Sequence, residues 1–291
     1  MNRRRLAHGD VTHPHRGVYV AAMPEQGYER CLAAVPLLGD RRWFSHVTAA
    51  RLWGIPLPFD AAGDDPLHVL ALPGAEPIRR PGFVGWETAA PPERVIHAGL
   101  PIIAPAAVWA QLCVPGATGQ DRTTGRRLAL SQEWLVVAGD FLLTGPRTAG
   151  RRTPLCTLDD LVDAVWAHRG KRGAKALTCA LAQVRRGPQS PRESLLRLAL
   201  VACGLPEPAV QPAVLTAAGI RHPDLGYLEA RVLIEYQGDH HRTDRRQWRE
   251  DLVRRQLFED AGHRVIEVAA DVFDDGCHAL AQRVRRALLR V

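Results

Sequence analysis

Asp224 and Glu235 are the two residues whose types and spacing most directly suggest chemistry. Asp224 follows a proline, ten residues separate it from Glu235, and Glu235 lies in a short apolar run. If these segments form a hairpin, both carboxylates come together. Mg²⁺ binds oxygen ligands and commonly uses one or two carboxylates, while water and substrate phosphate complete its shell. The alternative is an amphipathic strand with ordinary surface acids.

The residues around Glu235 show the alternation of a β-strand. Successive side chains of a strand point to opposite faces. Residues 231–237 therefore divide into two sets, with Val232, Ile234 and Tyr236 on one face and Leu233, Glu235 and Gln237 on the other. Glu235 and Gln237 are expected to share a face.

The stretch that contains both acids resembles known nuclease motifs. Pro223-Asp224 followed by Glu235-Tyr236-Gln237 is similar to the signature of the PD-(D/E)xK superfamily. The run EYQGDHH at 235–241 resembles the bacterial family related to the very-short-patch-repair (Vsr-like) endonucleases. The resemblance implies a metal-dependent endonuclease that acts on DNA, with Mg²⁺ or Mn²⁺ held by Asp224 and Glu235. It also implies catalytic positions at Gln237 and His241.

Residues after the hairpin would complete such a site. His241 could orient or deprotonate the attacking water, because imidazole titrates near neutrality; the alternative is a polar residue at a helix start. In the related family an Asp-x-x-Arg pair lies in the next helix, and Asp251 and Arg254 match it. Arg254 is expected to contact phosphate and Asp251 to orient it. Arg242 is expected to add to the nucleic-acid-binding surface.

Gln237 departs from the superfamily signature, which has lysine at this position. An amide can orient water but has no charge to stabilise a transition state. Lys171 and Lys175 are the only lysines of the chain, so no lysine follows Lys175. Either His241 or an arginine substitutes, or the domain is catalytically weak. The related repair endonucleases also lack this lysine and use histidine, which keeps activity plausible.

Glu193 has two candidate roles. Ser190-Pro191-Arg192-Glu193 places an N-cap, a proline at the first helical position and an acid three residues after the cap. Glu193 could make the reciprocal bond of a capping box. It could instead be the extra metal ligand that many nucleases of the superfamily take from their first helix.

Residues 189–291 are expected to form one domain. Its predicted elements are a helix from Ser190, a strand at Val210–Leu215, the hairpin with Asp224 and Glu235, a helix at Arg242–Gly262, a strand at His263–Val268 and a helix at about Asp275–Leu289. This α-β-β-β-α-β-α order matches a restriction-endonuclease-like fold. The whole chain is accordingly expected to be α/β, with an α+β N-terminal half.

Residues 1–150 resemble the N-terminal region of type IV abortive-infection antitoxins. The resemblance depends on the strand RGVYV and on the pattern Ser-His-x-Thr-Ala-Ala-x-Leu-x-Gly from Ser45 to Gly54. It implies a remnant of a winged helix and a cognate toxin or defence protein as a partner. The helix after Ser45 could meet phosphate or present a solvated face. Turns rich in Pro and Gly predict a mostly antiparallel sheet at 55–105.

Residues 151–188 are expected to form a helical connector. Thr157 and Asp160 make an acidic capping box, and a second helix runs from Ala174 to Arg186. The first helix is expected to bury a single stripe consisting of Leu158, Leu161, Val162, Val165 and Trp166. The basic run at 168–175 could lie on a phosphate backbone or be an exposed turn.

Composition adds weaker constraints. The formal net charge of +7 over 291 residues fits a polyanion-binding protein but also an ordinary soluble one. Six scattered cysteines form no C-x-x-C pair, and no apolar segment suggests a signal peptide or a membrane span. A cytoplasmic protein with no membrane partner is expected, and the oligomeric state is left open. The sequence favours a Mg²⁺-dependent DNA endonuclease acting in repair or phage defence; the alternative is a non-catalytic regulator that binds DNA or a toxin.

Overall fold

The structure is a computed structural model that describes residues 12–21, 27–58, 65–120, 127–237 and 245–289, with only the backbone described for 245–249. The described part contains both helices and mixed sheets. The chain divides into two compact units. Unit 1 comprises residues 1–142 and 154–183, and unit 2 comprises residues 143–153 and 184–291. Within the described ranges, no helix combines the length and apolar character needed to cross a bilayer.

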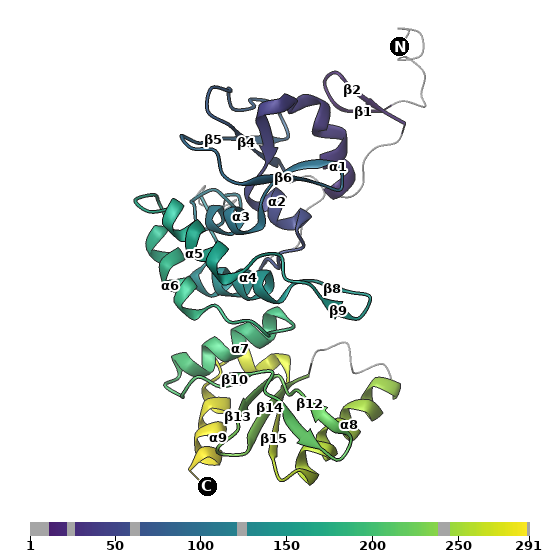
Figure 1. Cartoon of the computed structure of the whole chain (residues 1–291), viewed down its shortest axis with the longest axis vertical. Helices are drawn as coiled ribbons and strands as arrows, with labels where there is room; N and C mark the ends of the chain where they lie inside the picture. Colours follow the sequence, from purple (N-terminus) through teal and green to yellow (C-terminus); the bar gives the residue numbers. More distant parts are fainter. Residues whose placement is uncertain (1–11, 22–26, 59–64, 121–126, 238–244, 290–291) are drawn as a thin grey trace. The chain divides into compact units, whose positions relative to one another are not determined.

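Unit 1 is built on a mixed sheet with the strand order β5-β4-β3-β7-β6; Figure 1 labels β4, β5 and β6 of this sheet. The strands are β3 (Arg42–Phe44), β4 (Leu67–Ala71), β5 (Phe83–Glu87), β6 (Arg94–His97) and β7 (Leu100–Ile103). The β3–β4 and β6–β7 pairs are antiparallel, whereas β3–β7 and β4–β5 are parallel. The prediction of a mostly antiparallel sheet was therefore only half right. The segment after β4 returns the chain so closely over β5 that a Cβ on Gly85 would lie 2.4 Å from the Ile78 carbonyl oxygen.

Helices pack on this sheet and on one another. They are α1 (Gly27–Ala34), α2 (His46–Leu52), α3 (Pro105–Gln111), α4 (Gln132–Thr144), α5 (Leu158–Ala167) and α6 (Ala174–Gln183). Trp109 of α3 is fully buried and donates from its indole nitrogen to the Leu135 carbonyl at 2.8 Å. A separate hairpin of β1 (Thr12–His15) and β2 (Val18–Val20) contains the predicted RGVYV strand.

Helix α2 does not present the solvated face that its polar residues suggested. His46 and Thr48 are buried, with exposed fractions of 3% and 4%. Ser45 occupies the N-cap position without a capping hydrogen bond, because its Oγ pairs with His46 Nδ1 at 2.9 Å. Thr48 Oγ1 accepts a hydrogen bond from the backbone of His68 at 2.8 Å. Packing against the sheet therefore buries the polar side chains at the start of this helix.

Residues 151–188 do not form a connector of their own. Helices α5 and α6 belong to unit 1, and α5 packs against α3. The capping box of Thr157 and Asp160 is present in both directions. The predicted apolar stripe is narrower than expected, because Leu158 and Trp166 are 50% and 56% exposed while Leu161 is buried. Trp166 is instead covered on one face by the Arg169 guanidinium at 3.6 Å.

Unit 2 contains a sheet with the order β10-β13-β14-β15 (Figure 1). Its strands are β10 (Ala209–Val210), β13 (Leu225–Tyr227), β14 (Val232–Tyr236) and β15 (Arg264–Val268). The β10–β13 and β13–β14 pairs are antiparallel, and β14–β15 is parallel. Two short hairpins lie outside this sheet, formed by β8 (Arg147–Thr148) with β9 (Arg151–Arg152) and by β11 (Val214–Thr216) with β12 (Gly219–Arg221).

The predicted strand at Val210–Leu215 is split into β10 and β11. Gln211 has a positive φ of 46°, and Pro212 after it has no backbone N–H to donate. Both features interrupt a ladder, so the chain leaves the sheet, forms the β11–β12 hairpin and returns at β13. The observed order of elements thus has one hairpin more than the predicted α-β-β-β-α-β-α order.

Helices cover both faces of this sheet. They are α7 (Pro191–Ala202), α8 (Arg245–Asp260) and α9 (His278–Leu288). Val232 and Ile234 of β14 pack in one core with residues of α7 and α9. Leu233 points to the other face, where it packs with Phe258 of α8. The predicted alternation of β14 is confirmed, and Glu235 comes to the α8 side by the same alternation.

Candidate active site

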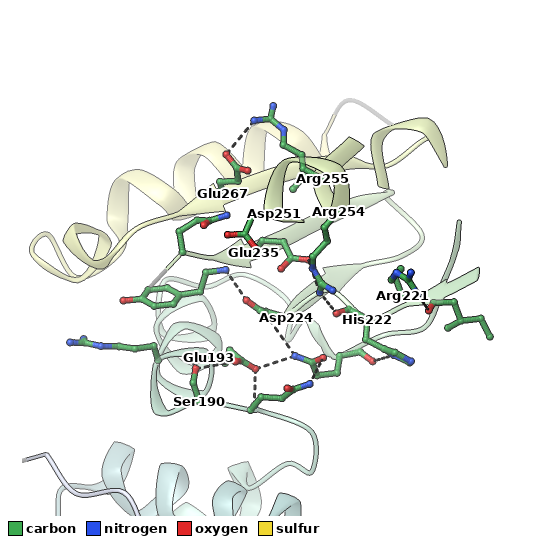
Figure 2. Close-up of a pocket in the computed structure, with 17 residues that line it drawn as sticks. Ser190, Glu193, Arg221, His222, Asp224, Glu235, Asp251, Arg254, Arg255 and Glu267 are labelled. Carbon is green, nitrogen blue, oxygen red and sulfur yellow. Dashed lines mark hydrogen bonds and ion pairs between the residues drawn. The ribbon is translucent and has the colours of Figure 1, made fainter. Parts of the chain in front are cut away.

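A cavity of about 620 Å³ in unit 2 gathers most of the residues singled out by the sequence (Figure 2). It lies where the N-terminal end of α7, the start of β13, the end of β14 and one side of α8 meet. The predicted site residues that line it are Glu193, Asp224, Glu235, Gln237, Asp251 and Arg254. His241 and Arg242 lie outside the described residues.

Asp224 and Glu235 are brought together by the β13–β14 hairpin. Leu225 pairs with Ile234 in the antiparallel register, so Asp224, one residue earlier, lies opposite Glu235, one residue later. The Tyr236 backbone N–H donates to Asp224 Oδ2 at 2.8 Å. Because this bond fixes one oxygen of the Asp224 carboxylate, the orientation of the group follows from the strand pairing itself.

Glu193 lies in the first turn of α7, where its carboxylate supports the start of the helix. Ser190 Oγ accepts from the Glu193 backbone N–H, and it donates to Glu193 Oε1 at 2.9 Å. The second carboxylate oxygen accepts from the backbone N–H of Gln189, the residue before the cap, at 2.8 Å. The side chain is only 6% exposed, yet it lines the cavity. Ser190 is therefore the cap of α7, and Glu193 bonds its hydroxyl and the preceding backbone N–H without the capping-box bond to the Ser190 backbone. Glu193 also adds a third carboxyl group to the cavity, and its role as a metal ligand stays a prediction.

Gln211 is a site residue that the sequence analysis missed. Its Nε2 donates to Glu193 Oε2 at 3.1 Å and to Asp224 Oδ1 at 3.4 Å. Its Oε1 accepts from Gln189 Nε2 at 3.1 Å. A single glutamine in a short loop has no distinctive spacing. Its only local signal is the proline that follows, which marks a break in the strand.

Burial and mutual repulsion make the three carboxyl groups hard to ionise together. Burial, followed by the charge of Asp224, raises the pKa of Glu193 to about 7 and that of Glu235 to about 8. Burial also raises the pKa of Asp224, against the lowering effects of the Tyr236 N–H and Arg254. A cluster of this kind gains stability from any cation that reaches it.

Arg254 supplies a positive charge at the edge of this cluster. Its Nε and a terminal nitrogen lie 3.2 and 3.1 Å from Glu235 Oε1, and it also donates to the His222 carbonyl oxygen. Its guanidinium lies 5.3 Å from the ring centre of Phe258. In this structure Arg254 therefore contacts the carboxylate of Glu235. Its contact with a phosphate stays a prediction. Asp251 lies on the same side of α8 and also lines the cavity.

Asp224 and Glu235 present carboxylate oxygens, the ligand type that Mg²⁺ and Mn²⁺ prefer. Among the described residues, no group of three or more His, Cys, Asp or Glu side chains is arranged to hold one. Mg²⁺ does not require such a cage, because one or two carboxylates with water and phosphate are sufficient. In the described part of the chain, Glu235 Oε2 accepts no hydrogen bond, and Asp224 Oδ1 accepts only the 3.4 Å bond from Gln211. Asp224 and Glu235 therefore fit Mg²⁺ or Mn²⁺, with Glu193 beside them.

Comparisons with known proteins do not identify a family. No protein-family profile, curated protein or solved structure matches this chain.

Proposed function

We propose that unit 2 is a Mg²⁺-dependent endonuclease that hydrolyses phosphodiester bonds of DNA. The observation that carries the proposal is the convergence in one cavity of Glu193 from α7, Asp224 from the residue before β13 and Glu235 from β14. Structural acids are normally spread over a surface or paired with bases. Three largely buried carboxyl groups, two of which have pKa values raised by the charge of the third, cost stability, and such a cost is typical of a functional site.

The chemistry follows from the residues around the cavity. A divalent cation at Asp224 and Glu235 would acidify a water and stabilise charge on the phosphate. Glu193 adds negative charge that favours the cation. Gln237, at the end of β14, offers a neutral amide that can orient the water, and His241 is proposed as its base. Arg254 supplies the fixed positive charge that the missing lysine would otherwise give.

The arrangement of the elements is consistent with the resemblance to the PD-(D/E)xK superfamily. A helix with an acid in its first turn precedes the sheet. One main acid immediately precedes β13, the other lies on its antiparallel neighbour β14, and a helix and a parallel strand follow. We propose on this basis a restriction-endonuclease-like domain of the Vsr-related kind. The β11–β12 hairpin is then an insertion between its first two strands.

Arginines around the cavity support a polyanionic substrate. Arg192 and Arg221 line the cavity itself. The β8–β9 hairpin carries the exposed Arg147 and Arg151, and its Arg152 donates to the carbonyl of Gln189 at 2.7 Å. Since Gln189 also bonds Glu193, the hairpin is anchored next to the carboxylates. Exposed arginines so placed can contact the phosphates that flank a bond held in the cavity.

The test is cleavage of supercoiled, linear, mismatched and single-stranded DNA with Mg²⁺ or Mn²⁺ by the full chain. Asp224→Asn is the loss-of-function variant. Glu229→Gln is the matched control, because Glu229 belongs to the same hairpin and lies outside the cavity. We expect cleavage by the control and none by Asp224→Asn. Equal cleavage by both variants would exclude this site.

A second candidate function is a non-catalytic regulator that uses the nuclease fold to bind DNA. The observation that favours it is the Arg254–Glu235 ion pair, which neutralises one of the two main acids without a metal. The resemblance of the N-terminal region to type IV antitoxins adds a cognate toxin as the partner of such a regulator. DNA binding without cleavage of any substrate, and without metal binding, would favour this function.

A further inference from the structure

Unit 1 contains a second cavity, of about 410 Å³, that the proposed nuclease does not use. Its lining comes from strand β5 and the segment that follows it, from helices α2 and α3, and from helix α5 and the residues that follow it. We propose that this cavity binds a small organic cation with a flat apolar body, such as an aromatic amidine or amine. The proposal is independent of the function assigned to unit 2, because every lining residue belongs to unit 1.

A buried histidine marks the inner part of the cavity. His46 lines it and is 3% exposed. Its Nδ1 pairs with Ser45 Oγ at 2.9 Å, while its Nε2 has no hydrogen-bond partner among the described residues. Burial, together with the nearby charges of His68 and His168, lowers the pKa of His46 well below its usual value, so the ring stays neutral. When Nδ1 donates to Ser45, Nε2 is an acceptor open to a ligand N–H.

The walls suit a flat apolar group. Trp86 stacks on the His46 ring with 3.9 Å between ring centres and 17° between planes. Small side chains from the facing helices α3 and α5 and two consecutive prolines complete the wall; these are Ala106, Ala107, Ala110, Ala164, Pro91 and Pro92. Small residues on facing helices leave room that larger residues would fill. The space is therefore bounded mainly by apolar surface, as in most small-molecule sites.

The rim of this cavity is acidic, whereas the net charge of the whole chain is positive. Four acids line the cavity, namely Glu87, Glu93, Asp160 and Asp163, and Lys171 is the only lysine or arginine among the described lining residues. The chain as a whole, in contrast, carries a formal net charge of +7. Asp160 is engaged by Thr157 in the α5 capping box. Glu87, Glu93 and Asp163 make no ion pair within the described residues. A cation is favoured at this rim, and an anion such as a nucleotide phosphate is disfavoured.

The experiment uses benzamidine as the probe, with benzamide and benzoate as its neutral and anionic counterparts. Isothermal titration calorimetry of the full chain is expected to show benzamidine binding with a dissociation constant of about 1 mM or tighter. Benzamide should bind more weakly and benzoate should not bind. The double variant Glu93→Gln/Asp163→Asn should weaken benzamidine binding by about 2- to 30-fold, because each of two exposed charge pairs contributes about 1.4- to 5-fold.

Two further variants test whether benzamidine binds in this cavity. Asp159→Asn removes an exposed acid of α5 that does not line the cavity, so it should leave binding unchanged. Ala167→Trp, at an exposed lining position, should abolish binding while the thermal unfolding midpoint stays near that of the wild type. Absence of benzamidine binding, equal binding of benzoate, or full binding by Ala167→Trp would each overturn the proposal.

Discussion

Glu193 and Asp224 share one amide group, because Gln211 Nε2 lies within 3.1 Å of a Glu193 oxygen and 3.4 Å of an Asp224 oxygen. This bridge joins the first turn of α7 to the start of β13. It also places two carboxyl groups side by side without an intervening base. The candidate site therefore depends on a neutral residue for its assembly.

Gln211→Ala should weaken the site without breaking the backbone. Gln211 already has a positive φ of 46°, so alanine introduces no new type of strain. The loss of shared hydrogen bonds should cost about 1 kcal/mol of unfolding free energy. The pKa of Glu193 should rise further, because the amide now lowers it. Urea denaturation and NMR titration of the Glu193 carboxyl check both effects, and an unchanged pKa would contradict the bridge.

Mn²⁺ should stabilise the wild type and fail to stabilise Asp224→Asn. At 100 times the dissociation constant, a ligand that binds only the folded state adds about 2.7 kcal/mol. The measurement is thermal unfolding at increasing Mn²⁺ concentrations, with Glu229→Gln as the control. Metal stabilisation that survives Asp224→Asn would show that the ion binds elsewhere.

Without metal, the carboxyl cluster should make unit 2 less stable as the pH rises. The folded pKa values of Glu193 and Glu235, about 7 and about 8, exceed the ordinary value of 4.5. The folded state thus holds more protons than the unfolded state, and its advantage is lost as the pH rises through these values. Buried His46 and His68 have lowered pKa values and act in the opposite sense. The difference in stability between wild type and Glu235→Gln, measured against pH, isolates the cluster.

The affinity for a metal ion should depend on the ionisation of the same carboxyl groups. Because the carboxyl groups must lose protons before they coordinate a cation, Mn²⁺ affinity should increase as the pH passes from below 7 to above 8. Calorimetry in buffers of different ionisation enthalpy should detect released protons. A pH-independent affinity would count against coordination by these groups.

Arg254→Ala should impair cleavage more than DNA binding. The variant removes the cation beside Glu235 and raises the pKa of that carboxyl further, since Arg254 now lowers it. A loss of about 100-fold in cleavage rate is expected, as for the removal of one group that stabilises transition-state charge. The exposed Arg264 of β15 provides the control variant Arg264→Ala. If only affinity falls, in parallel for cleavable and uncleavable DNA, the regulator becomes the better assignment.

Arg147→Ala/Arg151→Ala should weaken DNA binding uniformly across sequences. Each phosphate contact contributes about 0.9 to the slope of log affinity against log salt concentration, so the slope should decrease by about 2. Fluorescence anisotropy at several salt concentrations measures it. Arg283→Ala/Arg286→Ala on α9 removes an equal charge from two other exposed positions of unit 2. An identical effect of that control would indicate a diffuse charge effect and no hairpin contact.

The sequence by itself determined the features that depend on neighbouring residues. The alternation of β14, the pairing of Asp224 with Glu235 and the caps at Thr157 and Ser190 follow from the period of a strand and from the unsatisfied N–H groups of a first helical turn. These patterns are local, so a single chain read in order is enough to find them.

Tertiary structure alone decided how distant segments meet. Nothing near Gln211 indicates that a broken strand turns its amide toward Glu193, and nothing near Ser45 indicates that packing buries His46 beside Trp86. The parallel pairing of β4 with β5 likewise depends on the path of the intervening segment. Each of these contacts depends on how the chain reverses direction and on the free energy of packing between distant segments. The spacing of residues along the sequence contains neither kind of information.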